Sequence, residues 1–363
     1  MVYRALGLMS GSSLDGLDIA FAEFHEASGK WNFEIKAAAC YAYDAEWIAR
    51  LKNATAMKAL DYQLLHVAYG HYTGRLVNRF IEEYRLQHQV QLISSHGHTT
   101  FHVPSQQMTA QLGDGAAIAA TTGINTVSDL RAMDLARGGH GAPIVPIGEK
   151  LLLGEYPVFL NLGGIANISF NNSQDYIAFD VCPANRVLNM LAAGNHQPFD
   201  EGGKMAASGK VDDMLLSILN DLEYYRLPYP KSLSNDFGTD VVYTLIRNRK
   251  ISSADALRTY VEHISLQVKN AVAAAPVEAS GSKILLTGGG AHNDFLVKRI
   301  GDALKDFGIE VVVPDKMIVD YKEAIIMALI GVLRWREETN TLASVTGASS
   351  DSIGGAVWIG QEA

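Results

Sequence analysis

Apolar residues in the first part of the chain recur at strand spacing and then at helical spacing. Residues 3–9 and 17–24 are apolar-rich runs on either side of Gly11-Ser12-Ser13, which predicts an N-terminal hairpin with a Gly/Ser-rich tip. Residues 58–87 carry apolar side chains at helical spacing and predict a helix. The next expected elements are a strand over 91–95, a turn over 96–99, a helix over 113–122 and a strand over 124–128.

The second half of the chain loosely repeats this alternation. Strands over 157–161 and 167–171 are expected to pair as a hairpin around Gly163-Gly164. The remaining expected elements are strands over 177–180 and 283–287 and helices over 255–275, 293–305 and 322–335. Because each half offers strand–glycine–strand hairpins and strand–turn–helix units, the pattern predicts a mixed α/β protein with two domains and a cleft between them.

Composition narrows the class of protein. The chain has 363 residues, 48% of them apolar and 19% charged, which fits a globular enzyme with more than one core. Its net charge of −9 and lack of a Lys/Arg run argue against nucleic acid or an anionic membrane as a partner. Cys40 and Cys182 are too few for a disulfide framework, and neither a signal peptide nor an apolar run of about 18 residues is found. We therefore expect a cytoplasmic protein.

Three glycine-rich turns follow predicted strands: Gly11-Ser12-Ser13 with Asp15-Gly16, Gly163-Gly164, and Gly288-Gly289-Gly290. Backbone amides at such turns can approach phosphate oxygens because no Cβ blocks them, and the triple glycine also precedes a predicted helix, whose N-terminus favours anions. Taken alone, each cluster is more simply a tight turn. Neither GxxxxGK[ST] nor GxGxxG is present, which argues against those two phosphate folds and leaves other ATP folds open.

Two carboxylates lie at the ends of predicted elements. Asp180 ends an apolar strand and precedes a proline turn, so it is placed either as a general base or as the N-cap of the following helix. The spacing leaves both readings open. Glu323 begins a largely apolar helix, where it is most simply a first-turn acid that faces the helix dipole.

The histidines and the second cysteine have simple interpretations. His96, His98 and His102 invite a metal site, but no HExxH or CxxC occurs, so a polar contact from His96 to a substrate is favoured. Cys182 has no Lys or Arg beside it in sequence to lower its pKa, and we interpret it as a packing residue.

Several segments together resemble one family, the anhydro-N-acetylmuramic acid kinases, within the superfamily that includes hexokinase, actin and the heat-shock chaperone ATPases. The segments run along almost the whole chain in this order: GLMSGSSLDGLD at 7–18, SHGHT at 95–99, LGDGAAIAATTGINTVSDLRAMDLARGGHGAPIVP at 112–146, NLGGIAN at 161–167, FDVCPAN at 179–185, PKS at 230–232, LLTGGGAHN at 285–293, KEA at 322–324 and SVTGAS at 344–349.

The resemblance implies two domains of ribonuclease-H-like, actin/hexokinase-type fold that flank an ATP cleft. Residues 1–128 with about 325–363 would form the first domain, and residues 129–324 the second. ATP and Mg²⁺ are the implied cofactors; no protein metal ligand is assigned, and the Mg²⁺ carried by ATP would lie near Asp15. The implied partners are ATP, an anhydro amino sugar and a second copy of the chain in a homodimer.

The resemblance also implies roles for individual residues. The transferred phosphate would be cradled by the first hairpin, at Gly11, Ser12, Ser13, Asp15 and Gly16. Gly163 and Gly164 would form a second phosphate loop, and Gly288, Gly289 and Gly290 an adenosine segment. Asp180 falls at the position of the catalytic base, and the sugar would be contacted by His96, Gly97, Arg131 and Glu323.

The implied reaction is ATP-dependent: 1,6-anhydro-N-acetylmuramic acid is opened by water and phosphorylated on O6 during cell-wall recycling. The chain departs from the family's usual SGTS at Ser12, from SHGQT at His98 and from DTGP at Val181-Cys182. These departures concern the identity of the sugar more than the class of reaction. The alternatives are a kinase that acts on another anhydro sugar or on a simple sugar hydroxyl, and a nucleotide-gated binding switch of the same superfamily.

Overall fold

The computed structural model describes residues 1–11, 13–171, 176–229, 231–234, 236–275 and 282–360. The chain forms two compact units: unit 1 is Met1–Gly154 with Tyr321–Ala363, and unit 2 is Glu155–Asp320. The sequence predicts the first boundary between the two domains after residue 128. The chain instead stays in unit 1 until Gly154, because the segments after residue 128 include α4 (Ala132–Ala136), which contacts β5, and α5 (Pro146–Leu152), which contacts β3.

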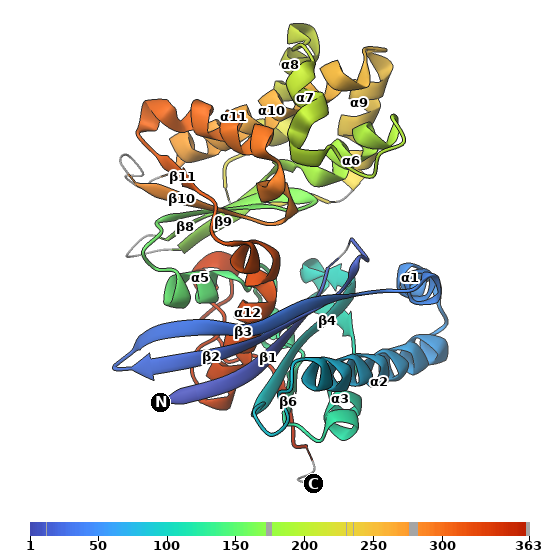
Figure 1. Ribbon diagram of the computed structural model, residues 1–363, viewed down its shortest axis with the longest axis vertical. Coiled ribbons are helices and arrows are strands. Elements are labelled where there is room, and N and C mark those ends of the chain that lie inside the picture. Colours follow the sequence, from blue (N-terminus) through green and yellow to red (C-terminus); the bar gives the residue numbers. More distant parts are fainter. Residues whose placement is uncertain (12, 172–175, 230, 235, 276–281, 361–363) are drawn as a thin grey trace. The chain divides into compact units, whose positions relative to one another are not determined.

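Unit 1 is built on a mixed sheet (Figure 1). Its first three strands form an antiparallel meander, and β4 and then β6 are added in parallel beside β1. The order is β12-β6-β4-β1-β2-β3, with β5 paired to β4. The strands are β1 (Val2–Ser10), β2 (Gly16–Ala27), β3 (Lys30–Ala42), β4 (Leu92–Val103), β5 (Met108–Leu112), β6 (Thr126–Ser128) and β12 (Ala356–Trp358).

Helices cover both faces of this sheet. Leu6 and Leu8 of β1 belong to a core cluster with residues of α2 (Ala59–Glu83) and α3 (Gly115–Thr122). Gly7 lies between them and faces α12 (Lys316–Trp335), where an added Cβ would overlap the backbone of Ala324. Glycine at this position therefore lets α12 approach the strand closely. The other helices of the unit are α1 (Ala45–Lys52) and α13 (Ala343–Thr346).

Unit 2 repeats the same strand arrangement. An antiparallel meander of β7, β8 and β9 is followed by β10 and β11 in parallel, in the order β11-β10-β7-β8-β9. This order and orientation define the ribonuclease-H-like fold, which therefore occurs once in each unit, as predicted. The strands are β7 (Val158–Leu162), β8 (Ile165–Asn171), β9 (Tyr176–Pro183), β10 (Lys283–Thr287) and β11 (Glu310–Val312).

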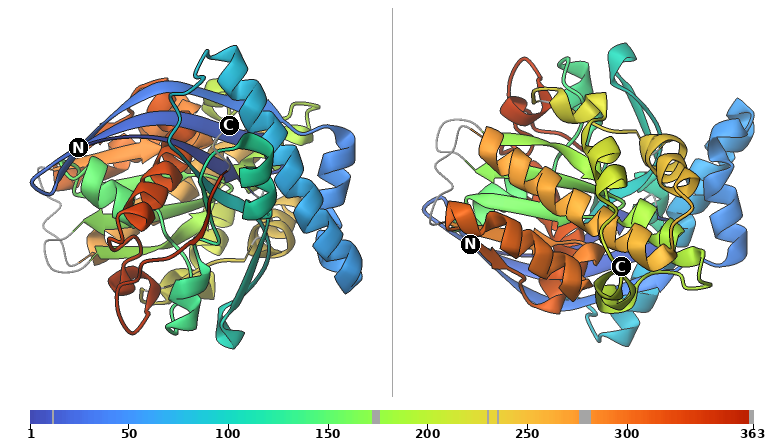
Figure 2. Two further views of the ribbon diagram at one scale, coloured as in Figure 1. Left: turned by 90° about the horizontal axis from the view of Figure 1, so that it is seen from below. Right: turned by 90° about the horizontal axis from the view of Figure 1, so that it is seen from above.

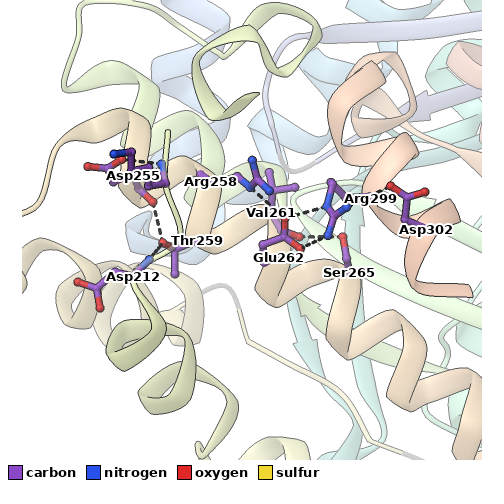
Figure 3. Close-up of polar contacts among 10 residues, drawn as sticks. Asp212, Asp255, Arg258, Thr259, Val261, Glu262, Ser265, Arg299 and Asp302 are labelled. Carbon is purple, nitrogen blue, oxygen red and sulfur yellow. Dashed lines mark hydrogen bonds and ion pairs between the residues drawn. The ribbon is translucent and has the colours of Figure 1, made fainter. Parts of the chain in front are cut away.

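Two helices, α10 (Ser253–Ala274) and α11 (Asp294–Leu304), lie over the sheet of unit 2 (Figure 2, right). Glu262 of α10 accepts two hydrogen bonds of 2.8 Å from Arg299 of α11 and one of 2.9 Å from Arg258 (Figure 3). This bidentate pair fixes the two helices in register. The other helices are α6 (Asn185–Ala193), α7 (Lys204–Ser208), α8 (Asp213–Asn220) and α9 (Tyr243–Asn248).

Two of the predicted elements differ from the structure, and several observed elements were not predicted. The turn expected over 96–99 is wrong, because β4 continues through it to Val103 with register shifts against β1 and β5. The sequence pattern predicted none of the strands β3, β5, β11 and β12, and none of the helices α1, α4–α9 and α13. The last long helix begins at Lys316 rather than at residue 322, because Asp315 Oδ1 accepts the backbone N–H groups of Met317 and Ile318 and so starts the helix earlier.

Candidate active site

Buried His96 and half-buried Arg131 form a pair in unit 1, near the place where the β1–β4 register shifts. Arg131 Nε donates a hydrogen bond of 2.8 Å to His96 Nε2, and His96 Nδ1 lies 2.9 Å from Gly97 O. Because a carbonyl oxygen can only accept, Nδ1 carries the ring proton and Nε2 is the acceptor. Burial, and then the Arg131 charge, lower the pKa of His96 to about 3, so the imidazole is neutral at physiological pH.

The guanidinium of Arg131 is fixed by a chain of hydrogen bonds. Arg131 Nη1 donates to Gly141 O at 2.6 Å, and the Gly141 N–H donates to Asp134 Oδ2 at 2.7 Å. Asp134 Oδ1 in turn accepts from Thr346 Oγ1 at 2.7 Å. Burial lowers the pKa of Arg131 to about 10, while the Glu323 and Asp134 charges raise it. Arg131 is therefore a rigid, charged donor at neutral pH.

Glu323 has a different position from the one expected. It is half-buried within α12, several residues after the helix start at Lys316, so its interpretation as a first-turn acid is wrong. Its charge acts on Arg131. The preceding residue, Lys322, is buried and forms an ion pair of 2.7 Å with buried Glu149 of α5. His96, Arg131 and Glu323 thus form one electrostatic group in unit 1.

A second buried network supports the end of β1. Ser10 Oγ lies 3.0 Å from His98 Nδ1 and accepts a hydrogen bond of 2.7 Å from the Tyr43 hydroxyl. The Tyr43 and Tyr69 hydroxyls are 2.5 Å apart. Burial lowers the pKa of His98 to about 4, so this ring is also neutral. The network holds the strand end from which the first hairpin tip, Gly11 and Ser13, projects; Ser12 lies outside the described residues.

Asp180 lies within β9 of unit 2 and is hydrogen-bonded to Tyr224, Lys231 and Leu233. Its Oδ2 accepts the Leu233 N–H at 2.8 Å, its N–H donates to Lys231 O at 3.1 Å, and its carbonyl accepts the Tyr224 hydroxyl at 2.5 Å. Burial raises the pKa of Asp180 to about 6, against the lowering effect of the Leu233 hydrogen bond. The N-cap of α6 is Ala184. The interpretation of Asp180 as the N-cap of α6 is therefore wrong. Asp180 is instead a carboxylate whose pKa lies close to neutral pH.

A pocket lies beside the segment that holds Asp180. Its volume is about 410 Å³, which is the size of a small-molecule site. Lys231 Nζ sits 4.6 Å above the Tyr224 ring and donates to Tyr224 O at 3.3 Å. Burial lowers the pKa of this ammonium. The pocket is lined by Leu222, Glu223, Tyr224, Leu227, Ser232, Leu233, Ser234 and Phe237.

The glycine clusters divide into two kinds by what a Cβ would meet. At Gly11, Gly163, Gly164 and Gly289 the nearest atoms are 3.4 Å or more away, and none of these residues has a left-handed φ. Packing in the described part of the chain therefore does not require glycine at these positions. Without a Cβ, the backbone at these positions can be approached closely by a ligand.

The other predicted glycines are required by the fold itself. A Cβ would lie 2.5 Å from Tyr41 O at Gly16, 2.5 Å from Asn161 Oδ1 at Gly288 and 2.7 Å from Leu162 Cβ at Gly290. Gly97 and Gly288 also have φ of +73° and +80°. Gly97 faces Leu112 O at 2.5 Å. These four residues have a structural reason to be glycine, whatever ligand is bound.

The remaining candidates have no metal-binding arrangement. His102 Nδ1 lies 3.3 Å from Thr109 Oγ1, so the three histidines have separate partners. Among the residues described, no cluster of three His, Cys, Asp or Glu side chains could hold a metal ion. Cys182 is buried, and burial raises the pKa of its thiol, which keeps it protonated in the core of unit 2. Asp15 is exposed beside the hairpin tip.

Comparison with known proteins gives the family. The model of the family "Anhydro-N-acetylmuramic acid kinase" matches residues 3–360. The chain belongs to the anhydro-N-acetylmuramic acid kinase family. It is 34% identical to the family member of Xylella fastidiosa, covering 97% of this chain and 95% of the relative, and 32% identical to that of Synechococcus elongatus, covering 98% and 99%.

Among solved structures, the activator of the 2-hydroxyisocaproyl-CoA dehydratase from Clostridium difficile with bound ADPNP aligns with a TM-score of 0.46 at 15% identity. This alignment covers 92% of this chain and 96% of that one.

A search of the described residues for helices with the length and apolar character of a membrane span found none.

Sequence reasoning missed the residues that hold this family's predicted site in place. Tyr43, Tyr69, Tyr224 and Leu233 contact site residues that are far away in the sequence, and no local pattern marks them. Arg186 was also missed, although the sequence marks it: a cation in the first turn of a helix is unfavourable and calls for an explanation.

Proposed function

We propose that this chain is an ATP-dependent sugar kinase that opens 1,6-anhydro-N-acetylmuramic acid with water and phosphorylates O6. The products are N-acetylmuramic acid 6-phosphate and ADP, as cell-wall recycling requires. One observation carries the proposal: in a member of this family, the carboxylate at the expected base position is half-buried, accepts a hydrogen bond from the Leu233 N–H, and has a pKa of about 6. Such a group is mostly ionised at pH 7 and can accept a proton.

In the proposed reaction Asp180 takes a proton from water, whose oxygen attacks the anomeric carbon. The bond from C1 to the bridging oxygen breaks, and its electron pair stays on that oxygen, which becomes O6. O6 attacks the γ-phosphorus, and the bond from phosphorus to the ADP oxygen breaks. The leaving oxygen thus forms a bond to the phosphoryl group, whereas in ordinary glycosidases an acid protonates it.

The sugar is proposed to be held by the unit 1 group. Arg131 offers a charged donor whose direction His96 and Gly141 fix, and Glu323 offers a half-buried acceptor beside it. An arginine held in this way loses little side-chain freedom when it binds a carboxylate or hydroxyl. A carboxylate-bearing sugar such as a muramic acid suits this pair.

ATP is proposed to contact the backbone at the glycines where an added Cβ would meet no atom closer than 3.4 Å, namely Gly11, Gly163, Gly164 and Gly289. Mg²⁺ bound to the nucleotide would neutralise charge on the transferred phosphoryl group. Asp15 is exposed beside the first hairpin tip, and we propose that it faces this ion.

The departures from the family pattern are compatible with this reaction. Val181 and Cys182 are buried in the hydrophobic core of unit 2, so they change the packing next to Asp180 rather than a group that faces a ligand. His98 bonds to Ser10. A cytoplasmic location and a homodimer stay predictions.

ADP release with and without 1,6-anhydro sugars tests the proposed function. We expect ADP release to depend strongly on 1,6-anhydro-N-acetylmuramic acid, with the analogue that lacks the lactyl carboxylate a much poorer substrate. If the enzyme prefers another anhydro sugar, the proposed class of reaction stands but the proposed substrate is wrong. Slow ADP release that no sugar changes would indicate a nucleotide-gated switch.

A further inference from the structure

Arg186 of α6 lies beside the Gly163-Gly164 turn, and its side chain has no ion-pair partner among the residues that the structure describes. Its Nε atom is buried and has no hydrogen-bond partner in the described structure. The same Nε lies 3.9 Å from the position that a Cβ would take at Gly164. Arg249 and Arg299 of the same unit pair with Asp212 and Glu262, but no such ion pair is found for Arg186 among the described residues.

The position of Arg186 is electrostatically unfavourable without a ligand. It is the second residue of α6, where the partial positive charge of the helix N-terminus repels a cation. Burying an unpaired guanidinium nitrogen adds a desolvation cost. A protein that retains both features gains from an anion that binds there.

The backbone amides at this helix start are already used. Ala184 N–H and Arg186 N–H donate to Gly164 O at 2.8 and 3.4 Å, and Asn185 N–H donates to Gly163 O at 3.0 Å. An anion would therefore be bound by the Arg186 side chain and by the glycine turn rather than by the helix amides. The fold does not need glycine in this turn, since a Cβ at Gly163 would make only ordinary van der Waals contact, with its nearest neighbour at 3.4 Å.

We propose that Arg186 binds the phosphate chain of ATP beyond the α-phosphate. The inference rests on the proposed function for the identity of the anion, a nucleoside triphosphate. It adds a residue that the glycine motifs do not contain. A guanidinium beside the Gly163-Gly164 turn would offer paired N–H donors to phosphate oxygens and offset their charge.

Calorimetry with a non-hydrolysable ATP analogue, and with AMP, in the absence of sugar tests this role. Arg186→Gln keeps a polar side chain and removes the charge, and should weaken the ATP analogue by roughly 10- to 100-fold. AMP affinity should change less than twofold. Arg247→Gln removes an exposed charge from α9 of the same unit and should change neither affinity.

The stability of the ligand-free variant separates binding from structure. Because the arginine is unfavourable in the absence of a ligand, Arg186→Gln should melt at the same temperature as the wild type or higher. A clearly lower melting temperature, or ATP-analogue affinity within twofold of wild type, would overturn the proposal. Gly164→Ala should also fold normally but weaken the analogue, because its methyl group would occupy the proposed phosphate space next to Arg186.

The outcome is distinguishable from failure of the proposed function. If no anhydro sugar stimulates ADP release but Arg186→Gln still loses ATP-analogue affinity, the sugar kinase proposal fails and the role of Arg186 stands. If sugar-dependent ADP release is found and the variant binds the analogue like wild type, the sugar kinase proposal stands and the role of Arg186 fails.

Discussion

Replacing Asp180 with Asn is expected to lower the turnover number by about 10²–10⁴, the usual contribution of a positioned general base. The asparagine side-chain oxygen can still accept a hydrogen bond from the Leu233 N–H, so Leu233 should stay beside residue 180. Affinity for an ATP analogue should therefore stay within twofold of wild type. Steady-state kinetics and calorimetry on the same preparations measure both quantities.

The pH profile gives the same prediction a second readout. Burial raises the pKa of Asp180 to about 6, and only the ionised carboxylate can accept a proton from water. Wild-type kcat/KM should therefore fall as the pH falls through about 6, and Asp180→Asn should lose this limb. Asp213→Asn, an exposed carboxylate in the first turn of α8, is the matched control. Near-normal turnover of Asp180→Asn would remove this residue from the mechanism.

Replacing Lys322 with Met is expected to destabilise unit 1 by about 3–5 kcal/mol, because it leaves the buried Glu149 carboxylate without its ammonium partner. All four tryptophans, Trp31, Trp47, Trp335 and Trp358, lie in unit 1. Intrinsic fluorescence during denaturant unfolding therefore reports this unit selectively.

Two control variants make the stability prediction specific. Glu34→Gln weakens the pair with Lys36 in unit 1, in which the Glu34 side chain is 63% exposed, and should leave the stability of unit 1 nearly unchanged. The double variant Glu149→Gln, Lys322→Met removes both charges and should be less destabilised than Lys322→Met alone. Equal unfolding midpoints for Lys322→Met and wild type would show that the buried pair contributes nothing. Since Lys322 precedes Glu323, a weaker affinity for sugar is expected as well.

The sequence predicted the elements well where local pattern decides them. The first hairpin, the long helix that is α2 and the β7–β8 hairpin all follow from apolar spacing and glycine position. The turn expected over 96–99 failed because His96-Gly97-His98 reads as a break, whereas Gly97 at a φ of +73° lets β4 continue beside Leu112.

The candidate site could be predicted only residue by residue. Asp180 and the glycine turns carry local signals, and family resemblance added Arg131 and Glu323. The physical role of each depends on contacts between distant parts of the chain. Arg131 bonds His96 across 35 positions, and Lys322 pairs with Glu149 across 173. Whether packing requires a glycine, as at Gly16, or does not, as at Gly164, depends on neighbours that no single motif contains.

The central claim is that water opens the anhydro bridge at C1 under the control of Asp180 while the old bridge oxygen takes the phosphoryl group. Turnover in ¹⁸O-labelled water tests it most directly. The bridge occupies one face of C1, so water must approach from the other, and one base suffices without a covalent intermediate. The account predicts label on C1, none in the sugar phosphate, and an inverted C1 hydroxyl caught before mutarotation. Label in phosphate, or retained configuration at C1, would contradict it.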